Sequence, residues 1–479
     1  MKGILSFMRF SILTILFSVL INSCNNFSSA TKNESDELKI KAQTPPMGWN
    51  SWNSLDFRAT EADIKNVADY MSENLLEYGW EYVVIDAGWY YPPEITCNDG
   101  KMDNIPQNLD EYGRLIPDVK KYPSADNNVG FKDLADYIHS KGLKFGIHIM
   151  RGIPWNAAAS DLPVKDSEFN ASEIADPENN CEWNKSMHGL KDYTGSKAYY
   201  SSLVELYSDW GVDFIKADDM IRPLHEHELT ALAEAINEID PDIVLSLSPG
   251  KAKIADAQTL TKTSEMWRVS NDFWDHWKYV VPTFQLLKDW TPYRGYGNWP
   301  DADMLPFGKL RKNGGDEWVA SRLNATPESI IDEYSRLTPD EMYTVMTLWS
   351  IAKSPLMLGG YLPENCELTN KLITNKEVIQ INQQSQNNKE VYNHNNTIAW
   401  KALDNENNGT SYIAVFNLSD ENREIEISFE DLEYDSNIFS ARDIWSKKNL
   451  GILMNKVNFE ISGHGARFIE LEKENDKKS

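Results

Sequence analysis

The chain has 479 residues, of which 41% are hydrophobic and 11% aromatic, so it can bury a large core and form more than one domain. Its 73 acidic residues outnumber its 47 basic ones, which gives a formal net charge of -26. This charge excludes nucleic acid and anionic membrane surfaces as favoured partners, because their phosphates would be repelled. The 16 Trp and 21 Tyr residues suit the apolar faces of sugar rings, so a neutral carbohydrate is the expected partner.

The first forty residues have the pattern of an export signal followed by a tether. Lys2 and Arg9 precede an apolar run that is too short to span a bilayer. This run ends in Leu20-Ile-Asn-Ser-Cys24, which resembles a bacterial lipobox. We therefore predict a signal peptide over residues 1–23 and a polar tether over residues 24–40 that begins at a lipidated Cys24. The expected location is periplasmic or cell-surface, with membrane attachment through the lipid alone. A plain signal peptide cleaved nearby is the alternative.

From residue 41 onward, short apolar segments alternate with amphipathic ones, which is typical of repeated β-α units. Eight such units predict an α/β fold, a closed (β/α)8 TIM barrel over residues 41–382 with its active site at the carboxyl ends of the strands. An open, doubly wound sheet is the alternative, but no Gly-x-Gly-x-x-Gly follows the first strand to bind a nucleotide. The expected helices include residues 62–78, 131–141, 198–210 and 224–239. The expected strands are residues 47–52, 82–87, 144–150, 212–218, 243–248, 265–270, about 297–303 and 353–359.

The fourth expected strand ends in carboxylates. A period of two places Lys216 and Asp218 on the same face of this strand, whereas Asp219 faces away. An ammonium beside a carboxylate favours the ionised acid, and an ionised, oriented carboxylate can act as a nucleophile. The structural alternative is a salt bridge at the strand end, which would also perturb the pKa values.

Polar side chains recur at the ends of the other expected strands. Any one of them could be a helix cap or a turn residue, but a rim built only for folding would avoid repulsion between carboxylates. Clustered acids without a metal-binding pattern favour glycoside hydrolysis, which needs one ionised and one protonated carboxyl group, so neither metal nor cofactor is expected. The segment His225-Glu-His-Glu228 lacks metal-ligand spacing and is interpreted as a solvated helix start. The strand-end residues are Asp86, His148, Arg151, Ser246, Ser248, Arg268, Asp272, Trp299, Asp301 and Asp303.

Several short motifs occur in a specific order along the chain. They are Thr44-Pro-Pro-Met-Gly-Trp-Asn-Ser-Trp52, Tyr82-Val-Val-Ile-Asp86, Gly142-Leu-Lys-Phe-Gly146, the segment from Trp210 to Asp218, Trp267-Arg268 to Asp272, Trp299-Pro-Asp-Ala-Asp-Met304 and Ser354-Pro-Leu-Met357. In this order, and over residues 44–382, the chain resembles glycoside hydrolase family 27, the α-galactosidase and α-N-acetylgalactosaminidase family.

The resemblance implies a retaining glycosidase on a (β/α)8 barrel followed by a β-sandwich. It also implies that Asp218 is the nucleophile and Asp272 the acid/base. The positions that match sugar-contacting residues of the family are Trp49, Asp86, Lys216, Arg268 and Trp299.

Departures from the family pattern bear on which sugar is bound. The family usually follows the acid matching Asp86 with a second aspartate and a cysteine, whereas Ala87 and Gly88 stand here. Ser248 occupies the place of a glutamate that α-galactosidases use near the 2-hydroxyl, and it resembles the N-acetylgalactosaminidase solution. We expect His148 and Arg151 to replace the missing polar contacts.

The expected activity is the removal of terminal α-D-galactosyl residues from an oligosaccharide or polysaccharide. Within the same chemistry, the alternatives are an α-N-acetylgalactosaminidase, because of Ser248, and a β-L-arabinopyranosidase, because a sugar without C6 needs no partner for O6. The alternative from a different class is a non-catalytic glycan-binding lipoprotein. Retention of both Asp218 and Asp272 argues against that last reading.

The carboxyl-terminal part has a different pattern. After a predicted linker at residues 383–388, short alternating runs separated by Asn, Asp and Gly predict an antiparallel β-sandwich over residues 389–473. Its expected role is to cover and stiffen the barrel. A sugar-binding role, with Trp400 and Trp445 as candidates, is the alternative.

Overall fold

The computed structural model describes residues 41–96, 102–312, 334–406 and 409–474, together with Ala320, Thr326 and Ser329. The predicted signal peptide, Cys24 and the tether lie outside the described residues. Within the described ranges, no helix combines the length and the apolar character needed to cross a membrane.

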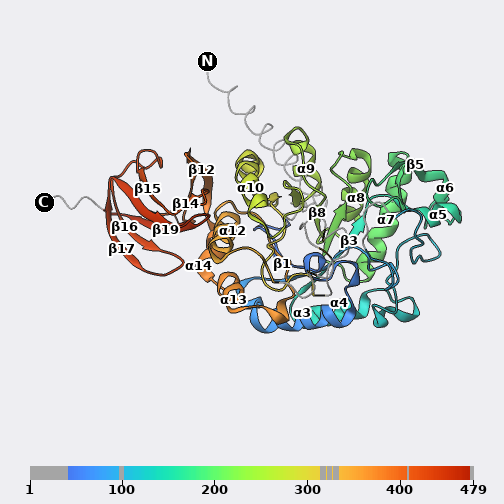
Figure 1. The fold of residues 1–479 in the computed structure, drawn as a ribbon. Coiled ribbons are helices and arrows are strands. Elements are labelled where there is room, and N and C mark those ends of the chain that lie inside the picture. Colours follow the sequence, from blue (N-terminus) through green and yellow to red (C-terminus); the bar gives the residue numbers. More distant parts are fainter. Residues whose placement is uncertain are drawn as a thin grey trace, which may run out of the picture. The chain divides into compact units, whose positions relative to one another are not determined.

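A closed barrel of parallel strands forms the first part of the described fold (Figure 1). The hydrogen-bonded order is β10-β9-β8-β7-β3-β2-β1-β11. The ring closes where Leu305, just after β10, bridges Leu358 of β11 in parallel. The predicted barrel is therefore confirmed, and the open sheet is excluded. The strands are β1 (Met47–Asn50), β2 (Tyr82–Ile85), β3 (Lys144–Met150), β7 (Phe214–Asp218), β8 (Val244–Leu247), β9 (Met266–Arg268), β10 (Trp299–Asp301) and β11 (Leu356–Leu358).

Helices follow the barrel strands, and several begin at capping side chains that the sequence carries. Thr60 and Asp63 form a capping box at the start of α3, each accepting from the other's backbone N–H. Asp192 accepts from Gly195 N at 2.9 Å, so α7 begins five residues earlier than the apolar pattern predicted. The helices are α2 (Trp52–Leu55), α3 (Glu61–Asn74), α4 (Lys132–Ser140), α7 (Tyr193–Asp209), α8 (Glu226–Ile239), α9 (Ala257–Thr263), α10 (Trp277–Trp290), α12 (Pro339–Ile351), α13 (Glu367–Ile373) and α14 (Lys376–Gln384).

An insertion between β3 and α7 forms a small substructure of its own. Its antiparallel sheet has the order β4-β6-β5 and is accompanied by two short helices. It carries Trp183, which reaches the cavity described below. Its elements are β4 (Ile153–Pro154), α5 (Trp155–Ala159), α6 (Ala171–Ile174), β5 (Ala175–Asn180) and β6 (Met187–Leu190).

The carboxyl-terminal part is an antiparallel β-sandwich, as predicted. Its larger sheet has the order β12-β13-β14-β19-β16-β17, and β15 pairs with β18 in the smaller one. The predicted linker at residues 383–388 is shorter in the structure, because α14 ends at Gln384 and β12 already begins at Gln386. The strands are β12 (Gln386–His394), β13 (Thr397–Leu403), β14 (Thr410–Asn417), β15 (Arg423–Ser428), β16 (Ile438–Asp443), β17 (Asn449–Met454), β18 (Lys456–Ile461) and β19 (Ala466–Lys473).

The sandwich packs on the barrel through α10 and α12, and α12 lies beside its strands in Figure 1. Phe416 packs edge-on against Phe284 of α10, with ring centroids 4.9 Å apart. Trp445 donates from Nε1 to Thr347 Oγ1 of α12 at 2.9 Å, and Trp400 is completely buried. The two tryptophans proposed as sugar-binding candidates therefore serve packing, because one has no exposed face and the other is directed at the barrel.

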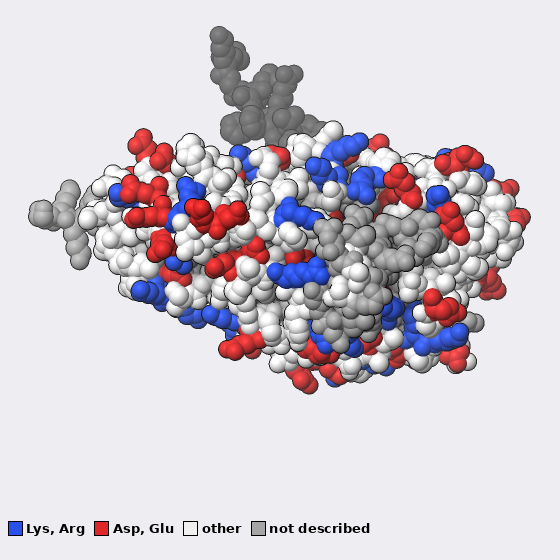
Figure 2. All heavy atoms as spheres, viewed as in Figure 1, with Lys and Arg blue, Asp and Glu red and all other residues white. Residues whose placement is uncertain are grey.

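On the face shown in Figure 2, lysine and arginine side chains are interspersed with aspartate and glutamate.

Candidate active site

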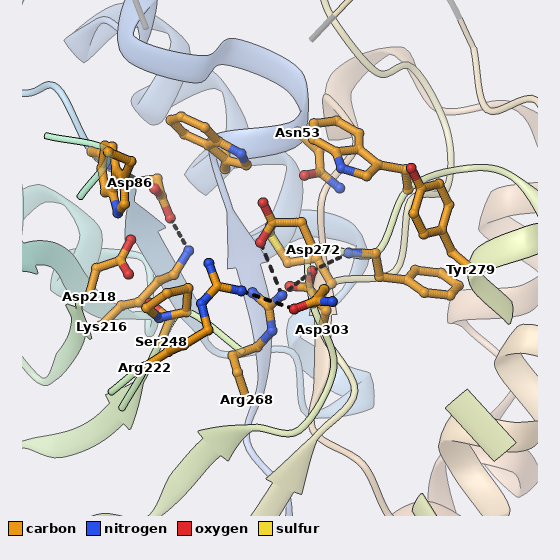
Figure 3. Close-up of a pocket in the computed structure, with 18 residues that line it drawn as sticks. Asn53, Asp86, Lys216, Asp218, Arg222, Ser248, Arg268, Asp272, Tyr279 and Asp303 are labelled. Atoms are coloured by element: carbon orange, nitrogen blue, oxygen red, sulfur yellow. Dashed lines mark hydrogen bonds and ion pairs between the residues drawn. The ribbon is translucent and has the colours of Figure 1, made fainter. Parts of the chain in front are cut away.

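A cavity of about 310 Å³ lies at the carboxyl ends of the barrel strands (Figure 3). Its charged lining comes from β7, β9 and the segments that follow β2, β7, β9 and β10, which are far apart in the sequence. Among the described residues, no group of three or more His, Cys, Asp or Glu side chains is placed to hold a metal ion. The charged lining residues are Asp86, Lys216, Asp218, Arg222, Arg268, Asp272 and Asp303.

Asp218 ends strand β7 and faces the cavity. His148, on the neighbouring strand β3, places Nε2 at 3.2 Å from Asp218 Oδ2, and the N–H of Asp219 donates to Oδ1 at 2.7 Å. Burial raises the pKa of Asp218, but the hydrogen bond and charge of His148 and the charge of Lys216 outweigh burial and lower the pKa below its ordinary value. Asp218 is thus an ionised carboxylate held in a fixed orientation.

Lys216 faces the cavity on the same side of β7 as Asp218, as the alternation predicted, but its ion-pair partner is Asp86. Lys216 Nζ lies 2.6 Å from Asp86 Oδ2, which also accepts from Asn50 Nδ2 at 2.8 Å. Burial raises the pKa of Asp86, but the charges of Lys216 and His148 lower it well below its usual range. The Lys216–Asp86 pair therefore forms a rigid, fully ionised part of the cavity wall.

Asp272 follows β9 and lies on the other side of the cavity from Asp218 (Figure 3). It is the most solvent-accessible acid of the group, with 39% of its side chain exposed. Arg268 Nη2 lies 3.2 Å from Asp272 Oδ1 and 2.8 Å from Asp303 Oδ2, so one guanidinium group bridges two carboxyl groups. Burial raises the pKa of Asp303 to about 7, and the charges of Asp272 and Asp301 add to this against the opposing effect of Arg268. Asp303 therefore binds a proton more readily than an exposed aspartate does.

Ala87 lines the cavity where the family pattern has a second carboxylate. Gly88 follows with φ of +93°, and a Cβ at that position would lie 2.5 Å from the ring of Phe57. Only glycine fits this turn, which fixes the methyl group of Ala87 as part of the wall. Ser248 also lines the cavity, and its buried Oγ has no hydrogen-bond partner among the described residues.

Arg151 was predicted to contact substrate, and the structure contradicts this. Its side chain is 1% exposed and is absent from the cavity lining. Nε lies 2.9 Å from Asp219 Oδ2 and Nη1 lies 2.7 Å from Glu228 Oε1. Glu228 is completely buried, so the expected solvated helix start is also wrong at this position. Asp219, with φ of +63°, turns its side chain away from the cavity to meet Arg151, because burying Arg151 requires carboxylate partners.

Two tryptophans were also predicted to contact the sugar, and neither lines the cavity. Trp49 is fully buried and donates from Nε1 to Gly360 O at 2.7 Å. Trp299 stands at the start of β10 rather than at its end and donates to Ala42 O at 2.7 Å. His148 is buried behind Asp218 and acts on it rather than on the cavity. The predicted residues that do line the cavity are Asp86, Lys216, Asp218, Ser248, Arg268 and Asp272.

Sequence reasoning missed an aromatic and amide part of the lining. Trp52 lay within the first motif as a visible signal, since it stands two residues past the end of β1. Asn53 follows Trp52 in α2. The others come from the insertion and from the segment after β9, where no periodic pattern predicts which way a side chain points. The aromatic and amide residues missed are Trp52, Asn53, Trp183, Asn271, Phe273, Trp274 and Tyr279, and the charged residue Arg222 was missed as well.

The buried pairs of Arg151 predict a large cost for its removal. Arg151→Met leaves Asp219 and Glu228 without their cation, and we expect the free energy of unfolding to fall by about 3 kcal/mol or more. Urea denaturation followed by circular dichroism measures this change. Lys165→Met is the matched control, because Lys165 pairs with Glu205 at 2.6 Å where both side chains are partly exposed, and such pairs contribute less than about 1 kcal/mol. Equal stability of the two variants would contradict the assigned role.

Comparison with protein families identifies both parts of the chain. The family model described as alpha galactosidase A matches residues 44–176 and 183–318. The model described as the alpha galactosidase C-terminal beta sandwich domain matches residues 395–471. The α-galactosidase of Cyamopsis tetragonoloba is 25% identical over 436 residues, which cover 90% of this chain and 86% of that protein.

Solved structures give closer similarities. A β-L-arabinopyranosidase of glycoside hydrolase family 27 from Geobacillus stearothermophilus is 40% identical, with a TM-score of 0.83 over 91% of this chain and 98% of its own. A candidate α-N-acetylgalactosaminidase from Bacillus halodurans is 38% identical, with a TM-score of 0.78 over 91% of this chain and 99% of its own. With these matches and the cavity described above, the chain belongs to glycoside hydrolase family 27, the α-galactosidase family, and is a glycoside hydrolase.

Proposed function

We propose that this glycoside hydrolase is a retaining exo-enzyme for terminal pyranosides with the hydroxyl configuration of α-D-galactose. The observation that carries the proposal is the pairing of Asp218 and Asp272 across one cavity, the first ionised and held by His148, the second exposed beside Arg268. Retaining hydrolysis requires two carboxyl groups that flank the anomeric carbon in different protonation states.

In the first step, Asp218 attacks the anomeric carbon while Asp272 donates a proton to the leaving oxygen. The C–O bond to the leaving group breaks, and a glycosyl ester forms on Asp218. In the second step, Asp272 takes a proton from water, which then attacks the same carbon and releases Asp218. Arg268 Nη2, at 3.2 Å from Asp272 Oδ1 and 2.8 Å from Asp303 Oδ2, holds both carboxyl groups in place through the two steps.

Among sugars of this configuration, we propose that the β-L-arabinopyranoside is turned over faster than the α-D-galactoside. The two sugars share the arrangement of ring hydroxyls, but the arabinoside lacks C6. Asp86 is already paired with Lys216, and next to it the methyl group of Ala87 offers no hydrogen bond to an O6 hydroxyl. The 40% identity to a β-L-arabinopyranosidase supports this preference.

Ser248 supports a second candidate glycone. Its small side chain leaves space for a C2 substituent, and its unpartnered Oγ can bond to one. The Bacillus halodurans relative is described as a candidate α-N-acetylgalactosaminidase. A parallel assay of the nitrophenyl α-galactoside, α-N-acetylgalactosaminide and β-L-arabinopyranoside separates the three activities. Sugar binding without turnover of any of them would instead indicate a non-catalytic glycan-binding protein.

The assigned pair of acids predicts the outcome of single substitutions. Asp218→Asn removes the nucleophile, and we expect kcat to fall by about a thousandfold or more while the fold remains intact. Asp272→Ala should lose most activity toward substrates with poor leaving groups. Azide should restore turnover by this variant, because it attacks the glycosyl ester on Asp218 without needing a general base. Proton NMR of the first product formed by the wild type shows the retained anomer. The control is Asp213→Asn, the same change beside His139 before β7, and an Asp218→Asn variant as active as this control would contradict the assignment.

The support of Asp218 by His148 predicts a pH effect. Burial raises the pKa of Asp218, and His148 lowers it. His148→Met removes the lowering effect of the imidazole, so the pKa of Asp218 rises. The acid limb of kcat/KM, which reports ionisation of Asp218, therefore moves to higher pH. His148→Gln, whose side-chain amide can donate from about the position of Nε2, retains more of the wild-type profile. A profile of His148→Met that superimposes on the wild type would refute this support.

Ala87 predicts a reversal of sugar preference. Ala87→Asp supplies an acceptor for O6, so the ratio of kcat/KM for the α-galactoside to that for the arabinoside should rise by about tenfold. Ala87→Val adds volume without an acceptor and should lower the same ratio. The measurement is kcat/KM for the two nitrophenyl glycosides. Equal ratios in the wild type and in both variants would show that position 87 does not contact the C5 substituent.

A further inference from the structure

Arg222, on the loop after β7, is held in the cavity wall by neutral groups. Its Nη1 donates to Gly250 O at 2.8 Å and to Asn271 Oδ1 at 3.0 Å. These acceptors belong to the loops after β8 and β9, and Figure 3 shows the guanidinium group among the cavity side chains. Both contacts use one nitrogen, so Nε and Nη2 make no hydrogen bond within the described residues.

The position of these acceptors is itself fixed. A Cβ on Gly250 would lie 1.4 Å from Ser270 O, so only glycine allows the loop after β8 to approach the loop after β9 this closely. The loop after β8 is also joined to the end of β9 by Ala252 N, which donates to Arg268 O at 3.0 Å. Arg222 is therefore preorganised, and less side-chain freedom is lost when it binds a ligand.

Arg222 is an exposed cation of the cavity wall. The other two cations of the lining are paired, Lys216 with Asp86 at 2.6 Å and Arg268 with Asp303 at 2.8 Å. Within the described residues, no carboxylate lies within ion-pair distance of Arg222. The chain has a net charge of -26, so acidic partners for a surface arginine are abundant. A cavity arginine that has none is available for an anion from outside.

The location of Arg222 indicates which part of the substrate meets it. Its partner Asn271 immediately precedes Asp272, the residue that protonates the leaving oxygen under the proposed function. Trp274 and Tyr279, from the segment that follows Asp272, line the same cavity and offer aromatic faces to a second sugar ring. The leaving group lies on the Asp272 side of the scissile bond, whereas the terminal sugar lies against Asp86 and Lys216.

We propose that the leaving-group sugar is acidic, and that Arg222 binds its carboxylate through Nε and Nη2. This inference rests on the proposed function and specifies the substrate class as chains in which the terminal sugar is attached to a uronic acid residue. The planar fork of arginine matches the two oxygens of a carboxylate. The negative net charge of the chain has little effect on the binding of an acidic sugar, because charges beyond a Debye length of about 8 Å are screened at physiological ionic strength.

Matched aryl glycosides test the proposal. The probes are the 2-, 3- and 4-carboxyphenyl glycosides of the preferred sugar, each compared with its carbamoylphenyl counterpart, which has the same shape without the charge. We expect kcat/KM for at least one acid to exceed that for its amide by about fivefold, as for a partly exposed ion pair. The excess should shrink as NaCl is raised.

Arg222→Gln and Arg222→Lys complete the design. Arg222→Gln should bring the acid-to-amide ratio to about one, and Arg222→Lys, which keeps the charge without the fork, should give an intermediate ratio. Two results would overturn the proposal: amides used as well as acids in all three series by the wild type, or a ratio unchanged in Arg222→Gln. If Arg222 instead contacts the terminal sugar, Arg222→Gln lowers both rates equally and leaves the ratio unchanged. Failure of the proposed function is distinct, because then neither acids nor amides are turned over.

Discussion

Buried ion pairs at the mouth of this barrel hold the geometry of the site. Lys216 and Asp86 meet at 2.6 Å, and Arg151 and Glu228 meet at 2.7 Å. A charge left alone in such surroundings would cost several kcal/mol, so these side chains have little freedom to move. Asp218 differs, because the side chain in direct contact with it is the imidazole of His148 rather than a lysine or an arginine. A carboxylate held in this way stays ionised and can still form a bond with carbon.

The sequence predicted the positions of those site residues whose direction follows from the alternation of side chains along a strand. Alternation along β7 placed Lys216 and Asp218 on one face, and the order of the strands brought Asp272 to the same rim, because parallel strands in a closed barrel end together. The alternation does not tell how far along the strand a residue lies from the cavity. Trp299 lies at the beginning of β10, away from the cavity, and its indole N–H donates to Ala42 O.

Partners that come from distant loops were beyond the sequence patterns. Arg151 looked like a cavity residue because it follows β3, yet it folds back to Glu228, seventy-seven positions further along the chain. Nothing local in the segment 225–228 distinguishes a buried glutamate from a solvated one, since its surroundings are set by α7 and the insertion. The same holds for Trp183 and Arg222, whose directions depend on how separate loops pack on one another.

The contact between the sandwich and α10 limits which sandwich domains can be exchanged between members of the family. His464, in the sandwich, stacks on Trp277 at 4.0 Å and bonds to Glu341 of α12 at 2.8 Å. Trp277 opens the helix whose third residue, Tyr279, forms part of the cavity wall. An exchange of sandwiches between relatives would thus also alter the wall beside the leaving group. Chimeras should inherit positions 277, 341 and 464 from a single parent if their choice of aglycone is to survive.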